Sequence, residues 1–85
     1  MTTGDSIHVY GADWCRDVRR TKQQLIDLDV EFDYVDVEAD PAAAERAQQI
    51  SGRGNIPVVV YPDGSHQVEP SNSGVEAKLR ELSIL

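Results

Sequence analysis

The chain has 85 residues, which fits one domain, expected to span residues 1–85. A net charge of −7 disfavours binding to nucleic acid or to an anionic membrane, because both would repel it. A single cysteine excludes an internal disulfide, so an apolar core has to hold the fold. The first residues do not resemble a secretory signal, and no apolar run approaches the roughly 20 residues that cross a bilayer. We therefore expect a cytoplasmic monomer.

The first third of the chain predicts a strand followed by a helix. Residues 7–10 alternate between apolar and polar up to Gly11, which predicts a strand with His8 on its solvent side. Residues 11–14 form a loop. From Cys15 to about residue 29, apolar side chains including Val18 recur at spacings of three and four, as on one face of an amphipathic helix.

The middle of the chain predicts a second strand and a second helix. Residues 32–37 are rich in aromatic and β-branched residues, which favours a strand. Asp40 suits an N-cap and Pro41 the first helical position. Gly52 suits a left-handed helix end, so we expect the second helix to stop there.

The last third predicts a hairpin and a third helix. Residues 58–61 are continuously apolar, which is typical of a central strand covered on both faces. A tight turn at residues 62–64 leads into a short returning strand at residues 65–68. After Pro70, apolar residues at positions 75, 79 and 82 predict the final helix.

The predicted order of elements is β-α-β-α-β-β-α, which defines an α/β fold. The first two strands are joined through a helix and should be parallel, with a right-handed crossover. The last two should form an antiparallel hairpin. The result is a four-stranded mixed sheet flanked by three helices.

Cys15 is placed where chemistry is expected, at the start of the first helix. Free backbone N–H groups and the helix dipole at such a position stabilise a thiolate. Four cations follow within seven positions: Arg16, Arg19, Arg20 and Lys22. They form either a solvated helix face or a local positive field beside the thiol, and Asp13 and Asp17 oppose the second interpretation. The alternative for Cys15 itself is a buried, inert residue.

Three segments together resemble the glutaredoxin branch of the thioredoxin-fold proteins, and most of all the short actinobacterial mycoredoxins. They are Trp14-Cys15-Arg16-Asp17-Val18 after a strand, Asn55-Ile56-Pro57 before an apolar strand, and Pro62-Asp63-Gly64 behind it. The likeness runs from residue 7 to about residue 82. It implies that Cys15 is the nucleophile and that a cis Ile56–Pro57 peptide faces it. It also implies that the backbone of Ile56 hydrogen-bonds an extended thiol substrate.

The chain departs from this family at several positions. Val18 stands where dithiol members carry a second cysteine, so an external thiol must complete any exchange. The Gly-Phe-Ser of iron–sulfur-carrying monothiol members is absent after Cys15. Residues 11–14 also lack the lysine that many glutathione-dependent members hold there. Mycothiol is therefore a better expectation than glutathione for the cosubstrate thiol.

Further residues are assigned to substrate binding by their position in the resemblance. Arg53 lies where the family contacts polar groups of the small thiol, although an exposed loop charge is an equal alternative. Ser71 and Asn72 begin the last helix, where N–H groups hold a carboxylate or sugar hydroxyl, unless Ser71 is only an N-cap. Trp14 packs against substrate or acts as a lid over the sheet edge. Arg16 follows the thiol directly and is included in this set.

The leading hypothesis is a monothiol thiol–disulfide oxidoreductase acting in redox homeostasis. Cys15 takes a small thiol from a thiolated or disulfide-containing protein, and a second small thiol regenerates it. No bound cofactor is expected, and His8, His66 and Cys15 do not have the spacing of metal ligands. Two alternatives stay open: a redox-inactive binding module of the same fold, and an iron–sulfur-bridged dimer.

Overall fold

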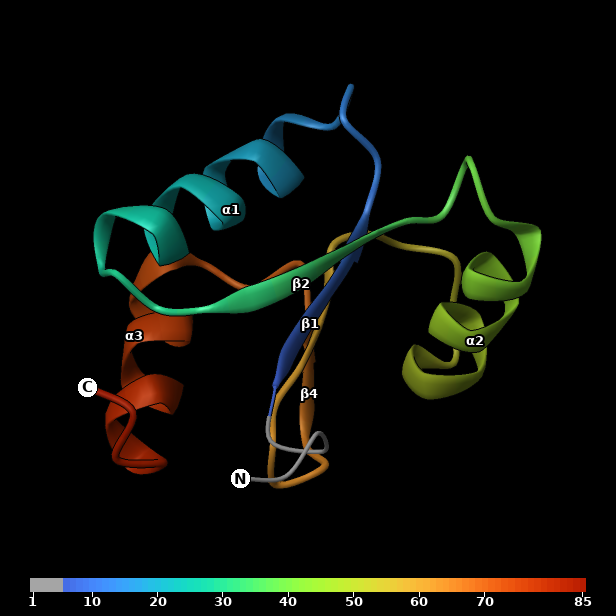
Figure 1. Ribbon diagram of the computed structural model, residues 1–85. Helices are drawn as coiled ribbons and strands as arrows, with labels where there is room; N and C mark the ends of the chain where they lie inside the picture. Colours follow the sequence, from blue (N-terminus) through green and yellow to red (C-terminus); the bar gives the residue numbers. More distant parts are fainter. Residues whose placement is uncertain (1–5) are drawn as a thin grey trace.

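The computed structural model describes residues 6–85, and in this range four strands and three helices follow the predicted order (Figure 1). They are β1 (Ile7–Gly11), α1 (Arg16–Asp27), β2 (Phe32–Asp36), α2 (Pro41–Ser51), β3 (Val58–Val60), β4 (His66–Val68) and α3 (Asn72–Glu81). The sheet order is β2-β1-β3-β4. β1 and β2 are parallel, and the other neighbours are antiparallel. The predicted mixed sheet is confirmed.

The sheet separates two apolar cores (Figure 1). α1 and α3 cover one face, where Val9 of β1 and Val59 of β3 point. α2 covers the other face, which receives Tyr10 and Val58. Val58 and Val59 are both fully buried, so the prediction of a central strand covered on both faces is confirmed.

Gly11 does not interrupt the first strand, as the sequence suggested, but is its last paired residue, opposite Asp36 of β2. The reason is the close approach of α1. A Cβ atom on Gly11 would lie 2.6 Å from both Cγ atoms of Val18. Glycine is therefore needed for packing at this point, and the strand continues through it.

The helix ends follow the predicted capping chemistry. The Asp40 side chain accepts a hydrogen bond from the Ala42 N–H at 3.1 Å, with Pro41 at the first helical position. Gly52 ends α2 with a φ of 78°, the left-handed conformation that glycine adopts without strain. α1 is shorter than predicted, because Cys15 is its N-cap residue and Leu28 its C-cap.

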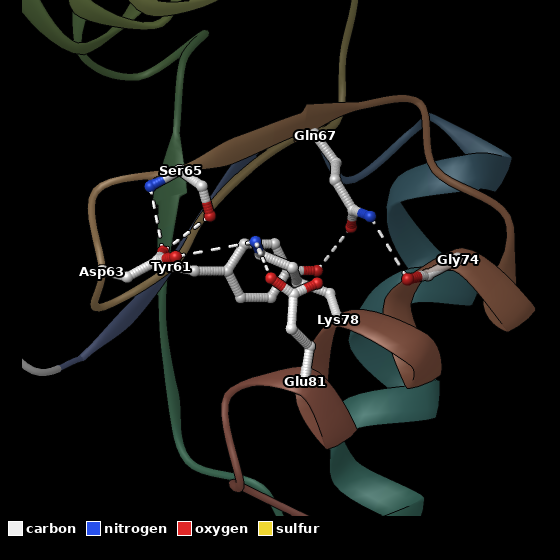
Figure 2. Close-up of polar contacts among 7 residues, drawn as sticks. All are labelled: Tyr61, Asp63, Ser65, Gln67, Gly74, Lys78 and Glu81. Carbon is white, nitrogen blue, oxygen red and sulfur yellow. Dashed lines mark hydrogen bonds and ion pairs between the residues drawn. The ribbon is translucent and has the colours of Figure 1, made fainter.

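A polar network joins the β3–β4 hairpin to α3 (Figure 2). The Tyr61 hydroxyl donates to the Gln67 side-chain oxygen at 2.5 Å, and the Gln67 amide donates to the Gly74 carbonyl at 3.2 Å. The Lys78 ammonium lies 3.6 Å from an Asp63 carboxylate oxygen. These contacts fix the hairpin, and with it β3, against α3.

Within residues 6–85, none of the helices combines the length and the apolar character that a membrane crossing requires.

Candidate active site around Cys15

Strand register brings the two segments expected to form the site, the one after β1 and the one before β3, to the same end of the sheet. Tyr10 of β1 pairs with Val58 of β3, so the loop leaving β1 toward Cys15 starts beside Pro57. The Ile56–Pro57 peptide is cis, as the resemblance implied. The N–H of Glu69 donates to the Pro57 carbonyl at 2.9 Å. The segment that precedes α3 therefore reaches the same end.

Cys15 is the N-cap residue of α1, with an extended backbone (φ −81°, ψ 122°). Its N–H donates to the Ala12 carbonyl at 3.1 Å, and its carbonyl accepts from the Arg19 N–H at 3.0 Å. Within residues 6–85 its side chain makes no capping hydrogen bond, and the thiol is half-buried. The sulfur thus lies at the positive end of the helix dipole and is not used to cap the helix.

Two cations of the cluster after Cys15 hold the loop in front of it. The Arg19 guanidinium donates to the Asp13 carbonyl at 2.9 Å, and Lys22 lies 3.6 Å from the Asp13 carboxylate. The Lys22 ammonium also sits 3.7 Å from the centroid of the Tyr34 ring. Burial, with the Asp13 carboxylate as a further cause, raises the pKa of the Tyr34 phenol well above its usual range. Arg19 and Lys22, both in α1, therefore have their partners in this loop and, for Lys22, in β2 as well.

A third cation, Arg20, links α1 to the start of α3. Its guanidinium lies 3.2 Å from an Asp17 carboxylate oxygen and donates to the Pro70 carbonyl at 3.2 Å. The Gln24 side chain donates to the Asn72 carbonyl at 2.7 Å. The cations that follow Cys15 therefore mainly connect α1 to neighbouring segments of the chain. This weakens the interpretation that they create a positive field at the thiol.

Val18 is fully buried between α1 and β1, on the apolar face where the sequence placed it. It stands three residues after the thiol, and Cys15 is the only cysteine of the chain. An intramolecular disulfide is excluded for this reason alone.

Arg53 and Ile56 line one small cavity of about 160 Å³ beside the cis peptide. Its lining includes Val37 and the buried Ala47, with Asn55 among the polar groups. The Arg53 side chain is exposed. Arg53 and Ile56 therefore line the same cavity, and their contact with substrate stays a prediction.

The start of α3 is an ordinary helix cap. The Ser71 hydroxyl accepts from the Gly74 N–H at 3.0 Å and lies 3.1 Å from the Ser73 hydroxyl. Ser71 and Asn72 are both exposed. The capping role of Ser71 is confirmed, and the binding role of both residues stays a prediction.

Trp14 and Arg16 flank the thiol, and both are exposed. The Trp14 side chain is 64% exposed, and its indole N–H donates to a Glu38 carboxylate oxygen at 2.5 Å. Sequence reasoning did not single out Glu38. A signal existed: β1 and β2 are parallel, so residues that follow their carboxyl ends lie at the same edge of the sheet.

No group of three or more metal-ligating side chains comes together anywhere in residues 6–85.

Comparison with known proteins agrees with this geometry. The glutaredoxin family model matches residues 7–67, more than half of the chain. The chain belongs to the glutaredoxin family. It is 35% identical over 80 residues to a Mycobacterium tuberculosis protein named "Putative glutaredoxin", covering 92% of this chain and 94% of that one. It is 32% identical over 79 residues to mycoredoxin 1 of Corynebacterium glutamicum, covering 92% and 98%.

Solved structures give the same result for the fold. The crystal structure of a glutaredoxin from Archaeoglobus fulgidus superimposes with a TM-score of 0.79 at 25% identity, covering 89% of this chain and 87% of that one. A glutaredoxin from Brucella melitensis superimposes with a TM-score of 0.72 at 23% identity, covering 94% and 87%. The chain is thus a mycoredoxin-like glutaredoxin with a thioredoxin-like fold and a glutaredoxin-like redox function.

Proposed function

We propose that this glutaredoxin reduces mixed disulfides between proteins and a small thiol by a monothiol mechanism. The observation that supports it is the position of Cys15. Its half-buried thiol sits at the start of α1, at the sheet edge that also holds the cis Ile56–Pro57 peptide. Val18 occupies the position three residues further on, so one sulfur has to serve both half-reactions.

The exchange balances with Cys15 and a second small thiol. The Cys15 thiolate attacks the small-thiol sulfur of the mixed disulfide, and a new disulfide forms on Cys15. The protein thiolate leaves and takes a proton from solvent. A second small thiolate then attacks the adduct, releases the oxidised small-thiol dimer and restores the Cys15 thiolate. Cys15 is thus the nucleophile of the first step and the leaving group of the second.

Mycothiol is the thiol we propose, in preference to glutathione. Residues 11–14 offer no lysine to an anionic thiol, and the loops on either side of the site contribute the carboxylates of Asp13 and Glu38. A sugar-bearing thiol of lower negative charge meets less repulsion there than the charged glutathione tripeptide. The mycoredoxin among the relatives supports the same choice.

A peptide with one cysteine, disulfide-linked either to mycothiol or to glutathione, tests this proposal. The purified protein should release the mycothiol adduct faster than the glutathione adduct, each assayed with its own thiol as reductant. The Cys15→Ser variant supplies the background. Turnover no faster than this background with both adducts would refute the oxidoreductase proposal, and a preference for glutathione would refute the choice of thiol.

Arg53 offers a separate test of the binding site. We expect Arg53→Ala to raise the KM for the mycothiol adduct about three- to tenfold, because one hydrogen bond to a polar ligand group is lost. Arg46→Ala is the matched control, since Arg46 is also exposed but lies within α2. Equal KM values for both variants would remove Arg53 from the site.

The pairing of Arg19, Arg20 and Lys22 with neighbouring groups favours a second candidate, a redox-inactive binding module. With these cations engaged, less positive charge remains to activate the thiol. The rate of Cys15 alkylation by iodoacetamide at pH 7 separates the two functions. A rate clearly above that of free cysteine supports the oxidoreductase, and an equal or lower rate supports the binding module.

A further inference from the structure

The loops that follow β1 and β2 run side by side next to the thiol. Gly11 and Asp36, the last residues of these parallel strands, are paired, and the Val37 N–H donates to the Gly11 carbonyl at 2.9 Å. Both loops leave the same end of the sheet (Figure 1). The first contains Trp14 and Cys15, and the second contains Glu38.

One side-chain hydrogen bond connects these loops, from the Trp14 indole to the Glu38 carboxylate at 2.5 Å. An indole N–H is a donor only, and a bond to a carboxylate is stronger than one to a neutral acceptor. Trp14 is 64% exposed, so few packing contacts restrict its side chain. The hydrogen bond therefore selects one orientation for a large aromatic ring directly before the nucleophile.

Glu38 is itself held in place from β2. The Asp36 carboxylate accepts the N–H of Glu38 at 2.8 Å and the N–H of Ala39 at 3.2 Å. An aspartate that bonds the N–H two residues further on forms a compact turn. The acceptor of the indole is thus anchored to the sheet, through the strand that pairs with β1.

We propose that Glu38 is a positioning residue, which holds the Trp14 indole in one orientation beside Cys15. The proposal rests on the oxidoreductase function, because the ring then offers a surface on which the non-reacting part of the small thiol packs. A large aromatic surface that is already oriented binds a ligand without a further loss of side-chain entropy. Glu38 acts only through Trp14 and takes no part in the exchange of sulfur.

A purely structural role does not account for this contact. It lies on the surface, where a hydrogen-bonded pair adds little to the free energy of unfolding. The loops are already joined by the bond from Val37 to Gly11 and by the Asp36 turn. What Glu38 adds is the orientation of the ring.

Fluorescence tests the positioning without any substrate, because Trp14 is the only tryptophan. We expect Glu38→Ala to lower the steady-state anisotropy of Trp14 and to increase its quenching by acrylamide. Glu38→Gln keeps an oxygen that accepts the indole N–H, so it should stay close to the wild type. Glu45→Ala is the control and should change neither quantity, because Glu45 is also an exposed glutamate but lies on α2.

Kinetics with the mycothiol-linked peptide test the role in binding. Glu38→Ala should raise the KM about fivefold with little change in kcat, as expected when a single hydrogen bond that aids binding is lost. Trp14→Phe, which lacks the N–H donor, should raise the KM at least as much. Because Glu38 acts through Trp14, the double variant should be no worse than Trp14→Phe alone.

The outcomes separate this proposal from the proposed function. If the wild type turns over but Glu38→Ala matches Glu45→Ala in KM, the role in binding is wrong. If Glu38→Ala leaves anisotropy and quenching unchanged, the positioning is wrong, whatever the activity. If the wild type shows no turnover with either adduct, the proposed function fails and takes the binding role with it, whereas the fluorescence result still decides the positioning.

Discussion

The two ends of the sheet use their polar side chains in different ways. At the hairpin end, Tyr61, Gln67 and Lys78 contact partners within the chain (Figure 2). At the opposite end, the Cys15 thiol is half-buried and makes no capping hydrogen bond, the Arg53 side chain is exposed, and most of the Trp14 ring faces solvent although its N–H bonds Glu38. Polar side chains that bond one another stabilise the fold, whereas exposed side chains and an accessible thiol are available to a ligand. Changes at the hairpin end should therefore alter stability, and changes at the Cys15 end should alter activity.

Replacing the nucleophile should separate the two ends most completely. We expect Cys15→Ser to reduce mixed-disulfide turnover to the level without protein, because a serine hydroxyl is not ionised near neutral pH and cannot form the disulfide intermediate. The midpoint of urea unfolding should stay close to that of the wild type, since the thiol is not part of either core cluster. Turnover retained by Cys15→Ser would show that another group carries the reaction.

The contact between Gly11 and Val18 is where the fold sets the position of the thiol. Gly11→Ala places a Cβ atom 2.6 Å from both Cγ atoms of Val18, so we expect a loss of about 1–3 kcal/mol in the free energy of unfolding. Urea titration measures this loss. Activity should fall as well, because α1 has to shift away from β1.

A double variant checks the cause of that loss. Val18→Ala removes both Cγ atoms, so it should make Gly11→Ala less costly than it is in the wild type. Additive losses in Gly11→Ala/Val18→Ala would show that steric overlap with Val18 is not the reason.

Local signals in the sequence were sufficient to predict most of the fold. The alternation in residues 7–10, the caps at Asp40 and Gly52, and the turn at residues 62–64 all depend on near neighbours. The prediction that β1 breaks at Gly11 was wrong, because glycine is needed there for a contact with Val18, which lies seven residues later on α1. Glycine looks the same in a sequence whether a turn or a close approach requires it.

The candidate site was predictable only in part. The resemblance to glutaredoxins supplied Cys15 and the cis Ile56–Pro57 peptide, and the structure confirms the latter. The spacing of Asp17 and Arg20 could have indicated their ion pair. The bond from Trp14 to Glu38 spans 24 residues, so it becomes visible only when β1 and β2 are known to be adjacent.

A smaller effect is expected from the hydroxyl of Tyr61 at the hairpin end. Tyr61→Phe removes the bond to Gln67 and should cost about 1 kcal/mol at pH 7, without reducing turnover. Burial raises the pKa of Tyr61 from 10.0 to about 12. Between these values the unfolded chain loses the proton first, so stability present below pH 10 declines toward pH 12.

Urea titrations at pH 7, 10 and 11.5 measure both effects. Tyr61→Phe should show a shallower alkaline decline than the wild type, although Tyr34 contributes in the same direction and keeps part of it. Identical alkaline slopes in the two proteins would show that Tyr61 does not cause the decline.

The smallest expected effect concerns Asp63, which is exposed in the hairpin turn. Hydrogen bonds from the Ser65 hydroxyl and N–H, with a smaller contribution from Lys78, lower the pKa of this carboxyl below 3.8. The unfolded chain therefore takes up the proton first on acidification, so the stability that Asp63 adds is present above about pH 4 and is lost at lower pH.

Asp63→Asn should be slightly less stable than the wild type at pH 7, with the difference disappearing near pH 2. Asp29→Asn is the control for the same chemical change at another exposed aspartate. Asp29 has a φ of 58°, which asparagine also adopts, so this substitution introduces no backbone strain. A difference that persists unchanged at pH 2 would assign the effect to packing in the turn, whereas one that fades places the charge of Asp63 with the stabilising contacts of the hairpin end.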